Sequence, residues 1–399
     1  MKNTIKKIAK RVTSAFGVEI VRCRHIDSIH ERVISLAPAT ESKGNVLLAF
    51  VIEPFLRGQD EPVSNAHSHD WESFQMAQTL LELGYRVDVI SYLNRRFVPD
   101  KHYSIFVAAR TNFERLATGL NKDCIKIVHL DTAHWIYNNR AAYARLLDVQ
   151  TRRRVTLNSV RIIEQNWALE HADYATVLGN DFTIGTYRYA DIEMSRVPVS
   201  VPVIYDWPEN KDFESCRKNF LWFGSAGFVH KGLDLVLEAF SDMPELHLTV
   251  CGPIDEDEKF KAAYFKELYE TPNIHTHGWV DVASREFERI ARGCVALVYP
   301  SCAEGGGSSA LTCMHAGLIP IVSRESSVDI GDFGVILEEF TIDAVKRQVK
   351  RLSLLPADQC ENSARRARDF ARRHHTRDIF AAAYKKTIQE ILNSHIVRE

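Results

Sequence analysis

The sequence lacks the features that mark several classes of protein. No segment approaches the roughly 20 consecutive apolar residues that a membrane-spanning helix requires. The net charge of −2 at pH 7 leaves none of the positive excess that is typical of nucleic-acid binders, so no nucleic-acid partner is expected. The basic N-terminal segment has no uninterrupted apolar stretch and no small-residue cleavage site, so we do not expect it to act as a secretory signal. We therefore expect a cytoplasmic protein.

Paired cysteine motifs are also absent. The 8 cysteines are scattered along the chain without a CxxC pair, and several lie in apolar runs, such as Cys251 in LHLTVCG and Cys294 in GCVALVYP. Cysteines in such runs indicate buried, reduced thiols rather than disulfides, again in a cytoplasmic protein.

Length and periodicity indicate two α/β domains. A chain of 399 residues is too long for one compact core. Short apolar runs alternate with helical patterns, which favours parallel α/β units, and the alternation pauses at 197–218. We expect domains at 1–205 and 206–375, followed by a helix within 376–399. The expected fold is α/β, with two doubly wound, Rossmann-like domains facing a cleft at the carboxyl ends of their strands.

The same patterns predict individual elements. Each strand is a short apolar run, as parallel strands buried on both faces require. The expected strands are 46–52, 86–91, 104–109, 125–130 and 175–178, then 220–224, 247–251, 274–277, 295–299 and 318–322. The expected helices are 71–83, 233–240, one around 287–291, 309–316, 341–354, 361–373 and 377–392.

A Gly-rich loop follows one of these strands. The strand 295–299 leads through Pro-Ser-Cys-Ala into Glu304-Gly-Gly-Gly-Ser-Ser and then into a helical pattern. Backbone N–H groups and the dipole at a helix N-terminus attract anions. Glycines let the backbone approach a phosphate closely, and Ser308 or Ser309 can cap the helix while donating to a phosphate oxygen. The pattern predicts a phosphate site, and a plain connecting loop is the alternative.

A second strand-to-helix turn carries a cation. The expected strand 220–224 ends in small residues, and His230-Lys231-Gly232 follows. Lys231 can neutralise a diphosphate as a point charge. The alternative is a solvated lysine near a helix start, where a positive charge gains nothing from the dipole, and this local mismatch favours the phosphate role.

These segments together resemble a known family. FLWFGSAGFVHKGLDLVLEAF, LHLTVCGP and VYPSCAEGGGSSALTCMHAGLIPIVS, within about 220–335, are similar in order and spacing to the retaining, nucleotide-sugar-dependent glycosyltransferases of family 4, or glycosyl transferases group 1. HSHDWESFQMAQTLLELGYRVDVIS resembles the family's first helix and second strand. The resemblance implies the two-Rossmann GT-B fold, in which the C-terminal helix within 376–399 packs back on the first domain.

The resemblance also implies roles for site residues. The family's loop Glu, near the donor sugar and phosphates, corresponds to Glu304, a candidate catalytic residue, and its diphosphate lysine corresponds to Lys231. The residues expected at the donor diphosphate are Gly227, Lys231, Gly305, Gly306, Gly307, Ser308 and Ser309. Those expected at the nucleotide are Thr312, Gly278 and Trp279.

Two positions depart from the family pattern. The family's second Glu, eight residues after the first, holds the nucleotide ribose, and Thr312 stands there. An arginine that contacts phosphate often follows the glycine of the first strand, and Ser225 stands there. Thr312 can hydrogen-bond a hydroxyl but offers no bidentate carboxylate. Weaker donor affinity, an unusual nucleotide and a lost activity all stay open.

The N-terminal half supplies candidates for the acceptor side. Asp131, His134 and Trp135 follow the expected strand 125–130, where family members often place a histidine or an acid. His134 can hydrogen-bond a sugar hydroxyl while Trp135 stacks on the sugar, and Asp131 can orient the acceptor or accept its proton. The alternatives are satisfied polar residues at a strand end, or a His129–His134 metal pair whose ligand set nothing nearby completes.

Further histidines precede the first expected helix. We expect His67 and His69 at the mouth of the cleft, and Ser68 or Asp70 as the cap of that helix. The preceding loop, 53–65, is long, which favours a mobile loop near the acceptor.

The N-terminal segment has an apolar face surrounded by basic residues. The apolar positions on one helical face are Ile5, Ile8, Val12 and Phe16, and the basic ones are Lys2, Lys6, Lys10 and Arg11. Such a helix can lie on an anionic membrane surface, which makes peripheral contact with the inner face of a membrane a candidate interaction. A packing helix or a frayed end is the alternative.

The resemblance implies transfer of a glycosyl unit from a nucleotide diphosphate sugar to a saccharide, lipid-linked or other acceptor, as in polysaccharide biosynthesis, with retention of configuration. The loop amides, Ser308 and Lys231 would stabilise the departing diphosphate, so neither a metal nor another cofactor is expected. One alternative is a nucleotide-sugar epimerase or a phosphorylase on the same fold. Another is a non-catalytic protein that binds a sugar or a partner, which the departures at Thr312 and Ser225 motivate.

Overall fold

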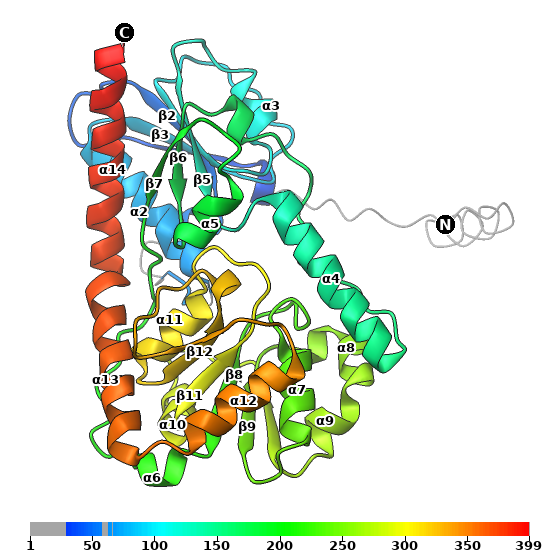
Figure 1. Ribbon diagram of the computed structural model, residues 1–399. Coiled ribbons are helices and arrows are strands. Elements are labelled where there is room, and N and C mark those ends of the chain that lie inside the picture. The colour runs from blue at the N-terminus through cyan, green and yellow to red at the C-terminus, as the bar shows by residue number, and fades with distance from the viewer. Residues whose placement is uncertain (1–28, 58–62, 66, 399) are drawn as a thin grey trace, which may run out of the picture.

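The computed structural model describes residues 29–57, 63–65 and 67–398, with the side chains of 396–398 left out. Two sheets, each covered by helices, form two domains that lie against each other (Figure 1). The basic segment at 2–16, for which membrane contact is predicted, lies outside the described residues. Among the described residues, no helix has both the length and the apolar character needed to cross a bilayer.

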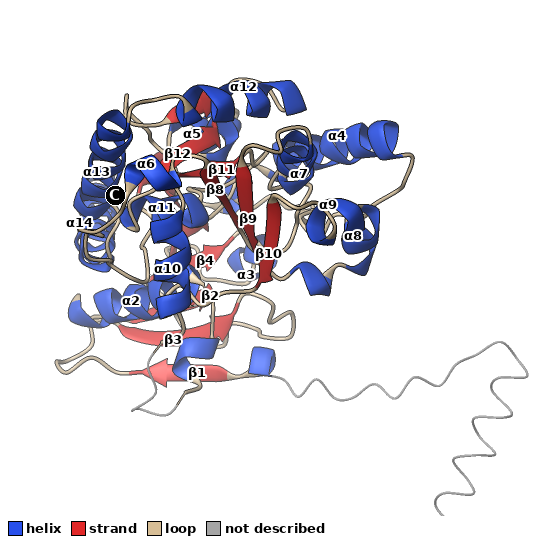
Figure 2. Cartoon of the chain, turned by 90° about the horizontal axis from the view of Figure 1, so that it is seen from below, coloured by secondary structure: helices blue, strands red, loops and turns tan. Residues whose placement is uncertain are grey.

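The first sheet has seven strands in the order β1-β3-β2-β4-β5-β6-β7. Its strands are β1 Val33–Leu36, β2 Asn45–Phe50, β3 Arg86–Ser91, β4 Ile105–Ala109, β5 Ile125–Leu130, β6 Tyr174–Val177 and β7 Glu193–Arg196. All neighbours are parallel except β1, which pairs antiparallel with β3 at the edge of the sheet (Figure 2). The two edge strands, β1 and β7, have no fully buried residue, so they lack the apolar runs that mark the other strands.

The second sheet has six strands, all parallel, in the order β10-β9-β8-β11-β12-β13. They are β8 Asn219–Phe223, β9 His247–Cys251, β10 Ile274–Gly278, β11 Ala296–Tyr299, β12 Ile319–Ser323 and β13 Val335–Leu337. The strand order reverses between β8 and β11, and ligands of such sheets bind at the carboxyl ends of the strands at this point. The expected α/β fold with two Rossmann-like domains is confirmed.

Every strand and helix expected from the sequence is present, with ends shifted by a few residues. The helices of the first domain are α2 Ser68–Glu82, α3 Phe113–Ala117 and α5 Asp181–Thr186. Those of the second are α6 Phe213–Cys216, α7 Leu233–Ser241, α8 Glu258–Ala263, α9 Phe265–Tyr269, α10 Arg285–Gly293, α11 Ser308–His315, α12 Ile342–Ser353 and α13 Ala357–His374. The seven described cysteines are all free and buried, as their apolar surroundings predict.

One long helix, α4 Trp135–Arg153, joins the two domains and was not expected from the sequence. It leaves the first domain after β5 and extends along the second (Figure 1). On the second domain, both oxygens of the Asp234 carboxylate of α7 accept hydrogen bonds from the Arg145 guanidinium, at 2.8 and 2.7 Å. Arg152 adds a third bond to Asp234 at 2.7 Å. The helix therefore fixes one side of the domain arrangement.

A second connection runs along the opposite side. Helices α13 and α14, the latter at Arg377–Arg398, follow each other along both domains (Figure 1). Helix α14 packs on α2 of the first domain, with the Phe380 ring against Trp71 at 5.8 Å between centroids. Lys385 forms an ion pair with Glu82 at 2.8 Å. The last helix thus returns the chain to the domain in which it began.

Candidate functional site

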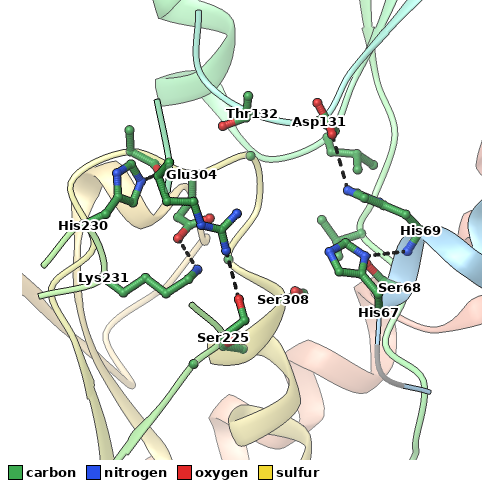
Figure 3. A pocket seen from close by; sticks show the side chains of 18 of the residues that line it. His67, Ser68, His69, Asp131, Thr132, Ser225, His230, Lys231, Glu304 and Ser308 are labelled. Carbon is green, nitrogen blue, oxygen red and sulfur yellow. Dashed lines mark hydrogen bonds and ion pairs between the residues drawn. The ribbon is translucent and has the colours of Figure 1, made fainter. Parts of the chain in front are cut away.

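A cavity of about 540 Å³ lies between the two domains. This volume is within the range of roughly 300 to 1,000 Å³ that is usual for small-molecule sites. Its lining comes from the segments after β5 in the first domain and after β8 and β11 in the second, which are carboxyl ends of strands (Figure 3). The position is the one that doubly wound sheets use for ligands.

A buried ion pair forms the centre of the second-domain wall. The ammonium group of Lys231 donates to Glu304 Oε1 and to the Tyr299 hydroxyl, both at 2.7 Å. Lys231 is only 3% exposed, so the alternative of a solvated lysine is wrong. Burial lowers the pKa of Lys231 to about 8, against the attraction of Glu304. The lysine is therefore a dehydrated cation that, among the described side chains, hydrogen-bonds to a single charged group, the Glu304 carboxylate. This state favours binding of a further anion.

The carboxylate of Glu304 is held by several donors. Besides Lys231, the hydroxyls of Tyr299 and Ser301 donate to Oε1, each at 2.8 Å. Burial alone would raise the pKa of Glu304, but the charges of Lys231 and Arg161 outweigh burial and hold the pKa well below its usual range. Glu304 is thus an ionised, oriented carboxylate at neutral pH.

The Gly-rich loop ends at the N-terminus of α11. The cap residue is Gly307, whose φ of 42° lies in the left-handed region, and no side chain caps the helix. The expectation that Ser308 or Ser309 caps α11 is wrong, because both belong to its first turn. Both serines and Thr312, one turn further along, line the cavity. The N-terminus of α11 therefore faces the cavity without a capping side chain, and its dipole favours a negative charge there.

Two of the loop glycines serve the contact between the domains. A Cβ added to Gly305 would lie 2.3 Å from the Asp131 carbonyl oxygen, and one added to Gly306 would lie 2.3 Å from Val199 and 3.1 Å from the Gly179 nitrogen. Gly306 does not line the cavity. Glycine is required at both positions because the first domain approaches the loop backbone closely, a reason that differs from the predicted approach of a phosphate.

An arginine from the first half of the chain completes this wall. Arg161 follows α4, and its guanidinium donates to the Ser225 hydroxyl at 2.9 Å and to the Ala226 carbonyl at 3.1 Å. No sequence motif marks Arg161. The signal in the sequence is indirect: Ser225 stands where the family often has an arginine that contacts phosphate. The structure thus brings two cations, Arg161 and Lys231, to the same end of the cavity.

The opposite wall contains a network of charged side chains. Asp131 forms ion pairs with Arg110 and, at 3.5 Å, with His69. His69 in turn contacts the buried Glu72 at 2.7 Å. Two side chains therefore already hold the Asp131 carboxylate, so the arrangement suits orientation of a ligand more than acceptance of a proton. His67 and His69 line the cavity as expected, but the cap of α2 is His67, not Ser68 or Asp70.

Comparisons with known proteins identify the fold. Residues 209–372 match the family of glycosyl transferases group 1. The chain is similar in structure to sucrose-phosphate synthase from Thermosynechococcus elongatus, with a TM-score of 0.61 and 13% identity over 88% of this chain and 99% of that one. It is also similar to HepE from Anabaena in complex with UDP and glucose, with a TM-score of 0.53 and 11% identity over 88% and 100%. The protein has the GT-B fold.

A larger protein with this fold also matches. TarM from S. aureus has a TM-score of 0.51 and 12% identity over 82% of this chain and 59% of TarM, so this chain spans about three fifths of that protein's length. No curated protein sequence matches the chain. At such identities the likeness to solved structures shows the GT-B fold, and the roles of individual residues rest on the geometry of the cleft.

Some predicted residues lie outside the GT-B cleft. His134 does not line the cavity; its side chain caps α4, accepting from the Ile136 N–H at 3.4 Å, and packs on Tyr187 and Tyr189. Burial lowers the pKa of His134, which fits a neutral cap. Gly227 and Gly278 also lie outside the lining, whereas Trp279 lines the cavity with 61% of its surface exposed. A side-chain role for His134 at the acceptor is therefore not supported by its position.

A metal would require a cluster of ligating side chains. Within the ranges that the structure describes, no group of three or more His, Cys, Asp or Glu residues has a suitable arrangement. The sequence contains one Asp-x-Asp run, Asp255-Glu256-Asp257, outside the cavity. There Asp257 caps α8 and Asp255 pairs with Lys261. Metal independence stays a prediction.

Proposed function

We propose that this protein transfers a glycosyl unit from a nucleoside diphosphate sugar to a saccharide or lipid-linked acceptor, with retention of configuration and without a metal. The observation that carries the proposal is the Lys231–Glu304 pair beside the uncapped N-terminus of α11. These groups gather at the carboxyl ends of β8 and β11, within a domain that matches glycosyl transferases group 1. HepE, which shares the fold, binds UDP and glucose, which supports a nucleoside diphosphate sugar as the donor here.

The chemistry of the second-domain wall suits a diphosphate leaving group. Negative charge on the diphosphate grows as the bond to the sugar breaks, so fixed positive groups stabilise the transition state more than the ground state. Lys231 supplies a buried cation, and the first turn of α11 supplies the positive end of a dipole together with the Ser308 hydroxyl. With these groups no divalent cation is needed to neutralise the departing charge.

The remaining lining residues suit the sugar and the acceptor. The donor sugar would lie near Glu304, whose ionised carboxylate accepts hydrogen bonds from sugar hydroxyls. The acceptor would enter beside Asp131 and His69 on the first-domain wall, where Arg110 pairs with Asp131. Retention rests on the resemblance of the segments within 220–335 to retaining enzymes.

A panel of nucleoside diphosphates and their sugars, read by thermal shift, tests the proposal. We expect one nucleoside diphosphate to raise the melting temperature of the wild type and to lose this effect in Lys231→Ala. The matched control is Lys259→Ala, which removes an exposed lysine of α8 in the same domain. If no nucleotide stabilises the wild type, the proposal is wrong.

A second candidate is a non-catalytic protein that binds a nucleotide sugar. Thr312 favours it, because this residue lines the cavity where the family has a ribose-binding carboxylate. Release of the nucleoside diphosphate from a bound donor, measured with and without candidate acceptors, separates the two. Acceptor-dependent release with a retained anomer supports the transferase, and tight binding with no release supports the binding protein.

A further inference from the structure

Arg161 lies at the donor end of the cavity, and among the residues that the structure describes it has no charged hydrogen-bond partner. Its guanidinium donates to a hydroxyl, that of Ser225 at 2.9 Å, and to a carbonyl, that of Ala226 at 3.1 Å. Both partners belong to the turn after β8, whereas Arg161 belongs to the segment after α4. A dashed line at Ser225 in Figure 3 marks the contact. The guanidinium therefore bridges two parts of the chain through neutral groups that an anion can replace.

The backbone of this segment is fixed by α4. The Asn138 side chain, which is 2% exposed, donates to the Arg161 carbonyl at 2.7 Å. Asn139 pairs with the backbone of Ile163 in both directions, at 2.8 and 2.9 Å. Gly227 packs against the stem, since an added Cβ would lie 2.6 Å from Arg161 Cγ. The arginine is thus held in place before any ligand arrives, which reduces the entropy cost of binding.

The charge balance at this end of the cavity is positive. Arg161 and Lys231 both act on the same carboxylate, Glu304, and together lower its pKa against the effect of burial. The neighbouring His230 is neutral near pH 7, because burial lowers its pKa to about 4. Two cations therefore face one carboxylate, which leaves a positive charge for an anionic ligand.

We infer that Arg161 is a donor-binding residue that contacts the diphosphate together with Lys231, so that the donor site is built from both halves of the chain. The inference rests on the proposed function. A planar guanidinium donates two parallel hydrogen bonds to a phosphate, which the ammonium of Lys231 does not. The contact with Ser225 places the guanidinium beside the turn after β8, where the resemblance leads one to expect an arginine and the chain has a serine.

Titration of the purified full-length protein with UDP, GDP and ADP by calorimetry tests the inference. For whichever nucleotide the wild type binds, we expect Arg161→Ala to weaken binding roughly 10- to 150-fold, the size of lost charge-assisted hydrogen bonds. The affinity of Arg161→Lys should lie between those of the wild type and Arg161→Ala, because lysine keeps the charge but not the planar guanidinium. The matched control is Arg140→Ala, which removes an exposed arginine of α4 outside the cavity and should bind as the wild type does.

A double variant separates binding from folding. Arg161→Ala combined with Ser225→Arg returns a guanidinium to the same part of the cavity, because the two side chains are 2.9 Å apart in the wild type. We expect this variant to recover most of the lost affinity. If Arg161→Ala binds with wild-type affinity, the inference is overturned and the proposed function stands. The same holds if Arg161→Ala loses affinity and Ser225→Arg does not restore it. A wild type that binds none of the three nucleotides would overturn the proposed function, and the inference with it.

Discussion

At the scale of single residues, the cleft depends on charges that are kept out of water. Lys231 and Glu304 are both largely buried, and each is stable because the other is present. Removing water from two charges costs several kcal/mol per ion unless hydrogen bonds and an opposite charge compensate. Tyr299 and Ser301 supply those hydrogen bonds. A bound diphosphate can therefore add a second negatively charged partner for Lys231 to this pair.

The first prediction concerns the sign of the charge at Glu304. Glu304→Gln keeps the shape of the side chain but removes a negative charge from the site proposed for a diphosphate. We expect binding of the nucleoside diphosphate to become about tenfold tighter, equivalent to about 1.4 kcal/mol, because one repulsion is lost. Transfer to an acceptor should fall at least about 100-fold, since an amide orients a sugar less strongly than a carboxylate. Calorimetry and a product-release assay measure the two effects, and weaker nucleotide binding would contradict the prediction.

Residues that act within their own motif could be predicted from the sequence, and residues that reach across the chain could not. Lys231 and Glu304 each lie in the loop that follows a strand, β8 and β11 respectively, so local pattern places them at the carboxyl edge of the sheet. Arg161 and Arg110 reach the cavity through contacts with partners 64 and 21 positions away. His134 follows Asp131 closely in the sequence. The turn between them places the His134 side chain at the N-terminus of α4, which it caps, and not in the cavity.

At the scale of elements, α4 is the longest of the helices that the sequence did not predict. Its buried residues, Asn138, Ala142, Arg145 and Val149, have helical spacing, but two of the four are polar. An apolar stripe is the main sequence signal for a helix, and here the buried face is defined by hydrogen bonds and an ion pair instead. The strands β2 to β6 carried clear apolar runs, and the sequence predicted them within two residues.

The second prediction concerns the clamp between α4 and α7. In Asp234→Ala the Arg145 guanidinium, whose side chain is 3% exposed, loses its buried carboxylate partner and keeps a contact with the half-exposed Asp148 at 3.3 Å. Breaking such a pair costs roughly 3 to 5 kcal/mol. We expect a loss of about this size in the free energy of unfolding, measured by urea titration. The control is Glu361→Ala, which breaks a pair with Arg365 that is about half exposed and should cost less than about 1 kcal/mol. Equal losses in the two variants would show that α4 is not fixed by this clamp.

At the scale of the whole molecule, the segment after β7 and the junction of α13 and α14 meet at buried histidines. The His375 side chain contacts the Val199 carbonyl at 3.3 Å, which joins that junction to the segment after β7. His315 of α11 contacts the His375 carbonyl at 3.0 Å. A ring nitrogen that faces a carbonyl must carry a proton and donate it. Burial lowers the pKa of each ring to about 4, so both rings are neutral in the folded protein near pH 7.

The third prediction is a loss of stability in mild acid. The unfolded chain takes up a proton on each histidine near pH 6.5, whereas the folded protein does so only near pH 4. Stability therefore rises with pH across this window and falls as the pH drops from 6.5 to 4, by about 1.4 kcal/mol per pH unit for each histidine. Melting temperatures between pH 8 and 5 measure the slope. His315→Gln with His375→Gln should make the slope shallower but not abolish it, because other buried histidines, such as His230, also have a lowered pKa. His102→Gln, at an exposed position, should leave the slope unchanged.

The distance between the domains is set at Gly305. Its backbone lies against the segment after β5, so that an added Cβ would be 2.3 Å from the Asp131 carbonyl oxygen and 2.5 Å from the Thr132 nitrogen. Both neighbours are backbone atoms, which cannot rotate away as a flexible side chain can. The φ angle of Gly305 is not in the left-handed region, so an alanine there would clash with neighbouring atoms without straining its own backbone torsions. Gly305→Ala is therefore a clean test of whether activity requires the closed arrangement.

The fourth prediction follows from that geometry. We expect Gly305→Ala to force the domains apart, which increases the radius of gyration in small-angle scattering and lowers transfer at least about 100-fold, because the acceptor wall no longer reaches the donor. Binding of the nucleoside diphosphate should weaken less, because Lys231 and α11 stay together in one domain. Gly185→Ala is the matched control, since an added Cβ there meets no atom within 4 Å. A wild-type radius together with wild-type transfer in Gly305→Ala would mean that the backbone adjusts locally and that this glycine does not control closure.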